Sequence, residues 1–361
     1  MFEQKAISLL LDLIAIPSFS REENKTADLI ERFLIGEGVQ ANRYLNNVWA
    51  CNLHFSPEKP TLLLNSHHDT VKPNPAWTRD PFTPNVENGT ITGLGSNDAG
   101  GPLVSLIATF LTFHNREDLP YNLVLAATAE EEISGRNGIE ALWPTLPHID
   151  MALVGEPTRM EMAVAEKGLM VLDCVAHGKA GHAAREEGVN AIYEAMQDIE
   201  WFKTYRFPNV SALLGPVKMS VTVINAGQAH NQVPPECRFS VDVRVTDAYT
   251  LEEVLETVRS HVKSEVTPRS MRLRPSGIAA DHPLVLAGKH CGCVLYGSPT
   301  SSDQALIPVP SVKIGPGDSA RSHSADEFIR EDEIRMGMEQ YCGILEMLRS
   351  TLVTAPDGRN A

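Results

Sequence analysis

The sequence of 361 residues predicts an α/β protein, with a mostly parallel sheet that is covered by helices and interrupted by an inserted α+β domain. Three observations carry this prediction. Short runs rich in Leu, Val and Ala alternate with helical patterns through the first 160 residues, which is typical of parallel strands with helices between them. Near Lys167 the pattern changes to alternating, half-exposed strands. After about residue 280 the first pattern returns.

Three short apolar runs are the expected central strands, at residues 61–65, 123–128 and 151–154, and each ends in a polar or glycine-rich turn. Because these runs hold few polar residues, we expect strands that are buried on both faces. A fourth strand is expected at residues 311–314. Helical patterns predict the covering helices at residues 1–16, 101–113 and 138–143.

The interrupting segment, residues 167–279, has the element order β-α-β-β-α-β of a ferredoxin-like unit. We therefore expect one domain made of residues 1–166 and 280–361, and a second made of the insert. The tail that begins at Ala355 is expected to be disordered. The expected strands of the insert are residues 171–176, 219–225, 239–245 and 271–273, and its expected helices are residues 190–205 and 251–263.

Composition excludes several classes of protein. The formal net charge of −15, without any cluster of Lys and Arg, disfavours a nucleic-acid partner and favours cations. The longest apolar run, residues 102–113, is too short to span a bilayer, and the N-terminal helix lacks the pattern of a signal peptide. Six cysteines are too few for a disulfide framework, and we interpret Cys291 and Cys293 as thiols of a cytoplasmic protein.

Residues of the types that bind metals follow each expected central strand. The carboxyl ends of parallel strands meet at one edge of a sheet, so these side chains should converge there. Each motif alone is more often a turn or a helix cap than a metal ligand. Together they place repeated carboxylates beside an apolar sheet, where uncompensated charge is costly. The set consists of His67, Asp69, Asp98, Glu130, Glu131, Glu132, Glu156 and His323.

Histidine and carboxylate ligands without cysteine suit zinc at a catalytic site, where one coordination position stays open for water. Two metal ions can share one carboxylate and activate one water between them. The residues therefore predict a metal centre, and its chemistry points to hydrolysis.

The motifs HHDTV, GLGSNDAGG, TAEEE, GEPT and SHSADEF also occur in an order and spacing that resemble a zinc hydrolase family. That family includes acetylornithine deacetylase, succinyl-diaminopimelate desuccinylase and aminoacylase. The resemblance covers nearly the whole chain, including the insert. It implies two zinc ions per chain, with Co²⁺ and Mn²⁺ as alternatives.

The resemblance also implies a role for each residue of the site. Asp98 would bridge the two zinc ions, and Glu131 would be the general base that takes a proton from the bridging water. Asp69 would orient the imidazole of His67, as a metal-bound histidine usually requires. The remaining ligands would divide between the two ions, with His67 and Glu156 on one and Glu132 and His323 on the other.

Within the insert, the motifs around His182 resemble the dimerisation or lid domain of the family. The resemblance implies a homodimer formed through residues 167–279, in which His182 stabilises the oxyanion in the partner's active site. The alternative is that His182 caps the following helix. Asn231 and Arg244 match positions that hold a substrate carboxylate, and the alternative for Arg244 is a surface strand residue. Gly315 would shape the loop that presents His323 and line the substrate pocket.

Two positions depart from the family pattern. Lys72 stands where the family usually has Pro, and Gly100 stands where it usually has a basic residue. Both departures bear on substrate preference more than on the reaction. The resemblance further implies a cis peptide bond between Asp98 and Ala99.

The expected activity is deacylation of an N-acyl amino acid, with N-acetylornithine of arginine biosynthesis as the first candidate and N-acetylcitrulline and N-succinylornithine as close alternatives. A dipeptidase or aminopeptidase would share the same metal ligands. A metal-binding scaffold without catalysis is a third hypothesis. It is disfavoured because the chain keeps both Glu131 and all the ligands.

Overall fold

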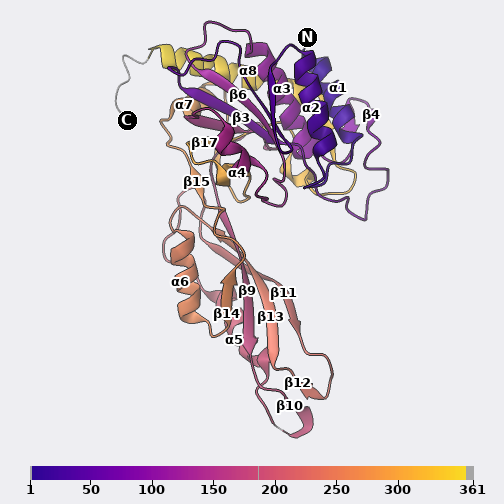
Figure 1. Ribbon diagram of the computed structural model, residues 1–361. Coiled ribbons are helices and arrows are strands. Elements are labelled where there is room, and N and C mark those ends of the chain that lie inside the picture. The colour runs from indigo at the N-terminus through magenta and orange to yellow at the C-terminus, as the bar shows by residue number, and fades with distance from the viewer. Residues whose placement is uncertain (1, 186, 355–361) are drawn as a thin grey trace. The chain divides into compact units, whose positions relative to one another are not determined.

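The computed structural model describes residues 2–185 and 187–354, which divide into two compact units (Figure 1). Unit 1 runs to Val164 and continues in Gly277–Tyr296 and from Ser302 onward. Unit 2 is formed by Ala165–Ser276 and Gly297–Ser301. The sequence pattern does not assign the last of these segments to the insert. The tail expected from Ala355 lies outside the described residues.

Unit 1 is built on a sheet whose centre is parallel, which confirms the predicted α/β class. Its four central strands lie in the order β6, β3, β7 and β17, and neighbours in this group pair in parallel. Strands that pair antiparallel extend the sheet on both sides. In sheet order the strands are β1 (Ala41–Tyr44), β2 (Asn47–Cys51), β6 (Asn122–Thr128), β3 (Thr61–His67), β7 (Met151–Val154), β17 (Ser311–Lys313), β8 (Met162–Glu166) and β15 (Ser276–Gly277), with β16 (Leu295–Ser298) paired to β8.

Alternate side chains of the central strands pack into two separate cores. Leu62 and Leu64 of β3 face the large core, whereas Leu63 between them faces the small one. Every residue of β3, β6 and β7 is buried, as expected for strands covered on both faces. Helices α1 (Phe2–Ile14), α2 (Asn24–Gly36), α3 (Gly101–Phe113), α7 (Pro283–His290) and α8 (Glu331–Thr354) contribute to the large core, and α4 (Ile139–Leu142) contributes to the small one.

The helix predicted at residues 101–113 is confirmed as α3, which lies almost wholly inside unit 1. It begins with Gly101 and Pro102, and a proline at this position leaves no amide unpaired. The hydroxyls of Ser105 and Thr109 donate to carbonyls four residues earlier, so these two polar side chains are buried at little cost. None of the helices in the described part of the chain is long and apolar enough to cross a bilayer.

A small sheet of unit 1 was not predicted. It pairs β4 (Asn85–Glu87), β5 (Thr90–Thr92) and β18 (Phe328–Arg330), which lie far apart in the sequence. Each strand has only three residues, too few to show a periodic pattern.

Unit 2 has the predicted ferredoxin-like arrangement. Its antiparallel sheet has the order β11, β13, β9 and β14, and two helices cover one face. Odd-numbered residues of β13, such as Phe239 and Val241, point into this core, whereas Ser240 and Asp242 point to the opposite face. The elements are β9 (Gly168–His177), α5 (Ala191–Thr204), β11 (Lys218–Ala226), β13 (Glu236–Val245), α6 (Leu251–His261) and β14 (Glu265–Pro268), with a small hairpin of β10 (Gly181–His182) and β12 (Gln232–Val233).

The strand expected at residues 271–273 is wrong. In the four-stranded sheet of unit 2 the strand before this position is β14, whose pairing with β9 ends at Pro268. Leu273 is buried and Met271 is half-buried, but both lie in irregular backbone. The two-residue spacing of these apolar side chains therefore does not indicate a strand here.

None of the six cysteines forms a disulfide. Cys293 is buried and Cys291 is half-buried. Burial raises the pKa of both thiols, which keeps them protonated.

Candidate metal centre

The predicted ligands of unit 1 converge at one edge of the parallel sheet. His67 is the last residue of β3, and Glu131 and Glu132 follow the end of β6. Glu156 follows β7, which runs parallel to β3. Because these strands point the same way, their carboxyl ends deliver the four side chains to the same place.

The other two ligands arrive on loops. Asp98 lies in a distorted helical turn, η1 (Ser96–Gly100), directly before α3. The predicted cis peptide bond between Asp98 and Ala99 is confirmed. His323 lies on the segment that follows β17 and has a positive φ of 60°, a conformation that few non-glycine residues adopt.

His67 is at the centre of the cluster and only 1% exposed. Its Nε2 atom lies 3.2 Å from Oδ1 of Asp98, 3.8 Å from Oε1 of Glu156 and 3.9 Å from Oε2 of Glu131. Its Nδ1 atom lies 3.0 Å from the backbone carbonyl oxygen of Asp69. An imidazole that donates from Nδ1 to this carbonyl presents the lone pair of Nε2 to the cluster.

His323 joins the cluster from the opposite side. Its Nε2 atom lies 3.0 Å from Oε2 of Glu132 and 3.7 Å from Oδ2 of Asp98. The two histidines therefore approach different oxygens of Asp98. The side chain of His323 is 55% exposed, so this face of the centre is open to solvent.

These donors fit a divalent cation. Two groups have ligand atoms within 4.8 Å of one another, namely His67 with Glu131 and Glu156, and His67 with Asp98 and Glu132. Nitrogen and carboxylate oxygen without sulfur are donors that zinc accepts. His67, Asp98, Glu132, Glu156 and His323 would hold the metal ions.

The electrostatics of the cluster support the same conclusion. Burial, together with the charge of Glu156, raises the pKa of Glu131 well above its ordinary value, although His67 opposes the shift. Burial also raises the pKa of Glu132. The hydrogen bond to Glu132 raises the pKa of His323 to about 9. Glu131 and Glu132 resist losing a proton, and His323 beside them retains one. The site therefore attracts positive charge.

Asp69 is fully buried and organises the residues around it. Its carboxylate accepts hydrogen bonds from the hydroxyl of Ser20 and from the backbone amides of Glu131 and Glu132. It also lies 3.5 Å from Nδ1 of His67. Burial opposes ionisation of Asp69, but the contact with His67 outweighs it and lowers the pKa. Asp69 thus connects the ends of β3 and β6.

The first glutamate of the TAEEE run has a different place. Glu130 has a positive φ of 56°, and its carboxylate accepts hydrogen bonds from the backbone and side-chain amides of Asn137. It closes the loop that follows β6. Only the next two glutamates reach the cluster.

Three buried residues near the centre were missed by sequence reasoning. His68 is held between the Thr26 hydroxyl and the Asn46 carbonyl, and burial lowers its pKa to about 4. Asp303 accepts hydrogen bonds from Asn65 of β3 and Thr128 of β6. The third residue is Glu327, whose pKa burial raises to about 8. His68, in HHDTV, and Glu327, in SHSADEF, belong to motifs that could have indicated them, whereas Asp303 belongs to none.

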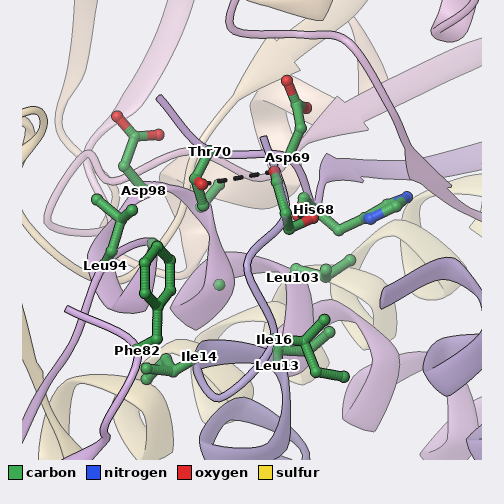
Figure 2. A pocket seen from close by; sticks show the side chains of 14 residues that line it. Leu13, Ile14, Ile16, His68, Asp69, Thr70, Phe82, Leu94, Asp98 and Leu103 are labelled. Atoms are coloured by element: carbon green, nitrogen blue, oxygen red, sulfur yellow. Dashed lines mark hydrogen bonds between the residues drawn. The ribbon is translucent and has the colours of Figure 1, made fainter. Parts of the chain in front are cut away.

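A small pocket with a mixed lining lies beside the centre. Figure 2 shows the carboxylates of Asp69 and Asp98 directed away from a small pocket lined by the side chains of Phe82, Leu94 and Leu103.

Two glycines near the centre leave no room for a side chain. A Cβ at Gly315 would lie 2.9 Å from the hydroxyl of Tyr341 and 3.1 Å from the backbone nitrogen of Glu156. Gly315 therefore packs against the backbone that carries a predicted ligand. A Cβ at Gly100 would collide with the carbonyl oxygen of Gly95, so the basic residue usual in the family would require the backbone to move. Lys72 is exposed.

His182, Asn231 and Arg244 belong to unit 2. His182 is exposed in β10, and its Nδ1 atom accepts the backbone amide of Ala184. It does not cap α5, because the Asn190 side chain does so. The backbone carbonyl of Asn231 accepts the amide of Ala183, next to His182. The guanidinium of Arg244 makes two hydrogen bonds to Asp242 on the same strand.

Several curated relatives and solved structures are similar to this chain. An acetylornithine deacetylase of Proteus mirabilis (strain HI4320) is 29% identical over 90% of this chain and 91% of its own length. A succinyl-diaminopimelate desuccinylase of Cereibacter sphaeroides (strain ATCC 17029) is 29% identical over 72% of this chain and 73% of its own length.

Two crystal structures share the fold over nearly all of both chains. A tripeptidase from Staphylococcus aureus has a TM-score of 0.79 and 21% identity, and the match covers 96% of this chain and 99% of the tripeptidase. The YXEP protein of Bacillus subtilis, described as a dinuclear metal-binding peptidase, has a TM-score of 0.72 and 16% identity over 97% and 99% of the two chains.

The profile of the peptidase family M20/M25/M40 matches residues 63–347, which include the whole cluster of metal-binding residues and all of unit 2. The chain therefore belongs to the peptidase family M20/M25/M40, a family of metal-dependent hydrolases.

Proposed function

We propose that the protein is a dizinc amide hydrolase that removes a small acyl group from an N-acyl amino acid, first of all N2-acetylornithine in cytoplasmic arginine biosynthesis. The observation that carries the hydrolase is the convergence of two histidines and three carboxylates on one open edge of the sheet, with Glu131 beside them. The first candidate substrate is taken from the Proteus mirabilis deacetylase, whose match spans almost the full length of both chains.

The donors divide into two places for metal. His67 and Glu156 would hold one ion and Glu132 and His323 the other, and the carboxylate of Asp98, which lies near both histidines, would be shared. When bound, two zinc ions would polarise the amide carbonyl and lower the pKa of the attacking water.

Glu131 has the position and the burial of a general base. Its carboxylate lies beside His67, and its raised pKa favours a group that can hold a proton for part of the reaction. Glu131 takes a proton from the water as the new C–O bond forms, and passes it to the nitrogen as the C–N bond breaks. The products are the free carboxylic acid and the amino acid.

The identity of the acyl group divides the candidates. The relatives include a desuccinylase as well as deacetylases, so N-succinylornithine and N-acetylcitrulline are the alternatives of the same class. A dipeptidase is the second candidate function, because the structural relatives include a tripeptidase.

Steady-state kinetics on zinc-loaded enzyme test the proposal. The panel is N-acetylornithine, N-acetylcitrulline, N-succinylornithine and a set of dipeptides. We expect the highest kcat/KM for N-acetylornithine. Turnover of dipeptides alone would overturn the deacylase proposal and leave a peptidase of the same family.

The role of Glu131 is tested against its neighbour. Glu131→Gln should lower kcat by about 10²- to 10⁴-fold and leave two zinc ions bound, because a general base contributes to proton transfer only. Glu132→Gln should lose zinc as well as activity. Zinc content measured beside kcat separates the two, and loss of zinc from Glu131→Gln would make Glu131 a ligand instead.

We further propose that unit 2 forms a homodimer. Its strand β11 is an edge of the sheet, and Val223 and Ile224 on it are 49% and 52% exposed. Tyr193 and Met196 of α5 are exposed as well. An edge strand with exposed apolar side chains pairs readily with a second copy. Light scattering should report a dimer for the wild type and a monomer for Ile224→Lys.

The proposed role of His182 in the partner's site has its own test. His182→Ala and Glu131→Gln homodimers are mixed under conditions that exchange subunits. If His182 acts across the dimer, the mixture should recover about a quarter of the wild-type activity. About half of the dimers are then hybrids, and one of the two sites in each hybrid is complete. No recovery would place His182 outside the partner's site.

A further inference from the structure

Glu327 carries an unusual set of hydrogen bonds for a residue without an assigned role. Its side chain is buried, and the residue is only 2% exposed. Oε1 accepts the backbone amides of Asp98 at 2.8 Å and Asn97 at 2.9 Å, and Oε2 accepts the amide of Gly95 at 3.2 Å. One carboxylate therefore satisfies three backbone amides of the loop that presents Asp98.

That loop has no regular structure to satisfy these amides otherwise. Gly95 has a positive φ of 74°, and Asp98 and Ala99 have φ and ψ values outside the helical region. Residues 95 and 98–100 of the loop line the small pocket of Figure 2, together with Leu94 and Leu103. A buried amide without an acceptor is costly, so the conformation of this loop depends on Glu327.

Glu327 also connects Asp98 to the second histidine. It stands four residues after His323, on the same segment of chain. Its backbone carbonyl accepts the amide of Gly93 and the hydroxyl of Ser96. Glu327 therefore contacts this part of the chain through its backbone as well as through its side chain. The 3.7 Å contact between His323 and Asp98 is thus set by a segment that is fixed to the loop at Glu327.

We propose that Glu327 is the positioning residue for the carboxylate that two metal ions would share, and that it acts through the backbone amide of Asp98. This inference rests on the proposed dizinc site. The residue touches neither substrate nor metal. It fixes the direction in which Asp98 presents its two oxygens, and the distance from Asp98 to His323.

Glu327→Gln is the sharpest substitution. Glutamine has the same size but replaces one acceptor oxygen with an NH₂ donor, so at least one amide of the loop faces a donor. Residues that orient metal ligands typically cost 10- to 100-fold in metal affinity when changed. We expect zinc affinity to fall by about that factor, with the larger loss at the ion held by Asp98, Glu132 and His323.

A matched control exists in unit 2. Asp198 is also buried, and its carboxylate accepts the backbone amides of Lys263 and Ser264. Asp198→Asn therefore breaks the same kind of contact away from the metal-binding residues. It should lower the thermal midpoint without changing zinc affinity.

The experiment measures zinc binding to metal-free full-length protein by titration against a chelating indicator, without substrate. The absorption spectrum of the Co²⁺-loaded protein reports the geometry of the ligands in the same samples. Glu327→Asp, which keeps the carboxyl group but shortens the side chain, should give an intermediate affinity and provides the test if Glu327→Gln does not fold. Wild-type affinity and an unchanged Co²⁺ spectrum in a folded variant would overturn the proposal.

The result of this experiment can be distinguished from the result of the substrate test. If the wild type binds two zinc ions but hydrolyses no acyl amino acid, the substrate proposal fails and the role of Glu327 stands. If Glu327→Gln loses only stability, as Asp198→Asn does, Glu327 is a structural residue and the inference fails.

Discussion

The two units bury charge in different ways. Unit 2 buries Asp198 and satisfies its carboxylate with two backbone amides and the hydroxyl of Ser264. Unit 1 buries several carboxylates at one edge of its sheet, and those of Glu131 and Glu132 retain raised pKa values there. A carboxylate that is fully hydrogen-bonded is stable on its own, whereas a cluster of carboxylates needs a cation. The difference makes unit 1 the part that we expect to depend on metal.

The sheets explain why the cluster forms in unit 1. Parallel strands end at a common edge, so residues that follow β3, β6 and β7 meet there. In unit 2 the strands are antiparallel, and successive strand ends lie at opposite edges. One face of this sheet packs against helices and the other carries ion pairs such as Asp173 with Arg269.

Removing the metal should therefore destabilise unit 1 and leave unit 2 unchanged. This is the largest effect that we expect. Each bound ion stabilises the folded unit by about 4 kcal/mol when its free concentration is 1,000 times Kd. Dialysis against a chelator should abolish activity and increase hydrogen exchange in residues 61–67, 95–100 and 122–132. The exchange of β9 and β13 should stay unchanged. Equal loss of protection in both units would show that the two units depend on metal to the same degree, and would contradict this prediction.

Much of the centre could be predicted because each ligand follows an apolar run that is recognisable by itself. His67, Glu131, Glu132 and Glu156 are all of this kind. Asp303 and Glu327 could not be found in this way, since their partners are backbone and side-chain groups hundreds of positions away. Their role is visible only once the loops are placed.

The fold was predictable to the same extent. Long buried strands and α3 were recognisable from composition and spacing. The three-residue strands β4, β5 and β18 carry no periodicity, and they form because distant segments pair. At residues 271–273 the two-residue spacing of Met271 and Leu273 suggested a strand, although the pairing of β14 with β9 ends at Pro268.

A core substitution in unit 2 should give the next largest effect. Phe239 is buried on β13 and packs edge to face against Phe202 of α5, with ring centroids 6.1 Å apart. Phe239→Ala should lower the free energy of unfolding of unit 2 by about 3–5 kcal/mol, because it leaves a cavity. Hydrogen exchange resolved by peptide measures the loss. Zinc affinity should match the wild type, and a drop in affinity would mean that the stability of unit 2 controls the metal centre.

The smallest effect comes from the start of α6. The Thr250 hydroxyl accepts the amide of Glu253 while the carboxylate of Glu253 accepts the amide of Thr250, so each side chain satisfies a backbone group of the other. Thr250→Ala should cost unit 2 about 1 kcal/mol. Ser260→Ala, at the exposed far end of the same helix, removes a hydroxyl that donates to a carbonyl and should cost less than about 0.5 kcal/mol. If the two variants lost equal stability in urea, the capping contact would not contribute to the free energy of unfolding. If Thr250→Ala also released zinc, the two units would be coupled even by a change this small, and the contrast between them would fail.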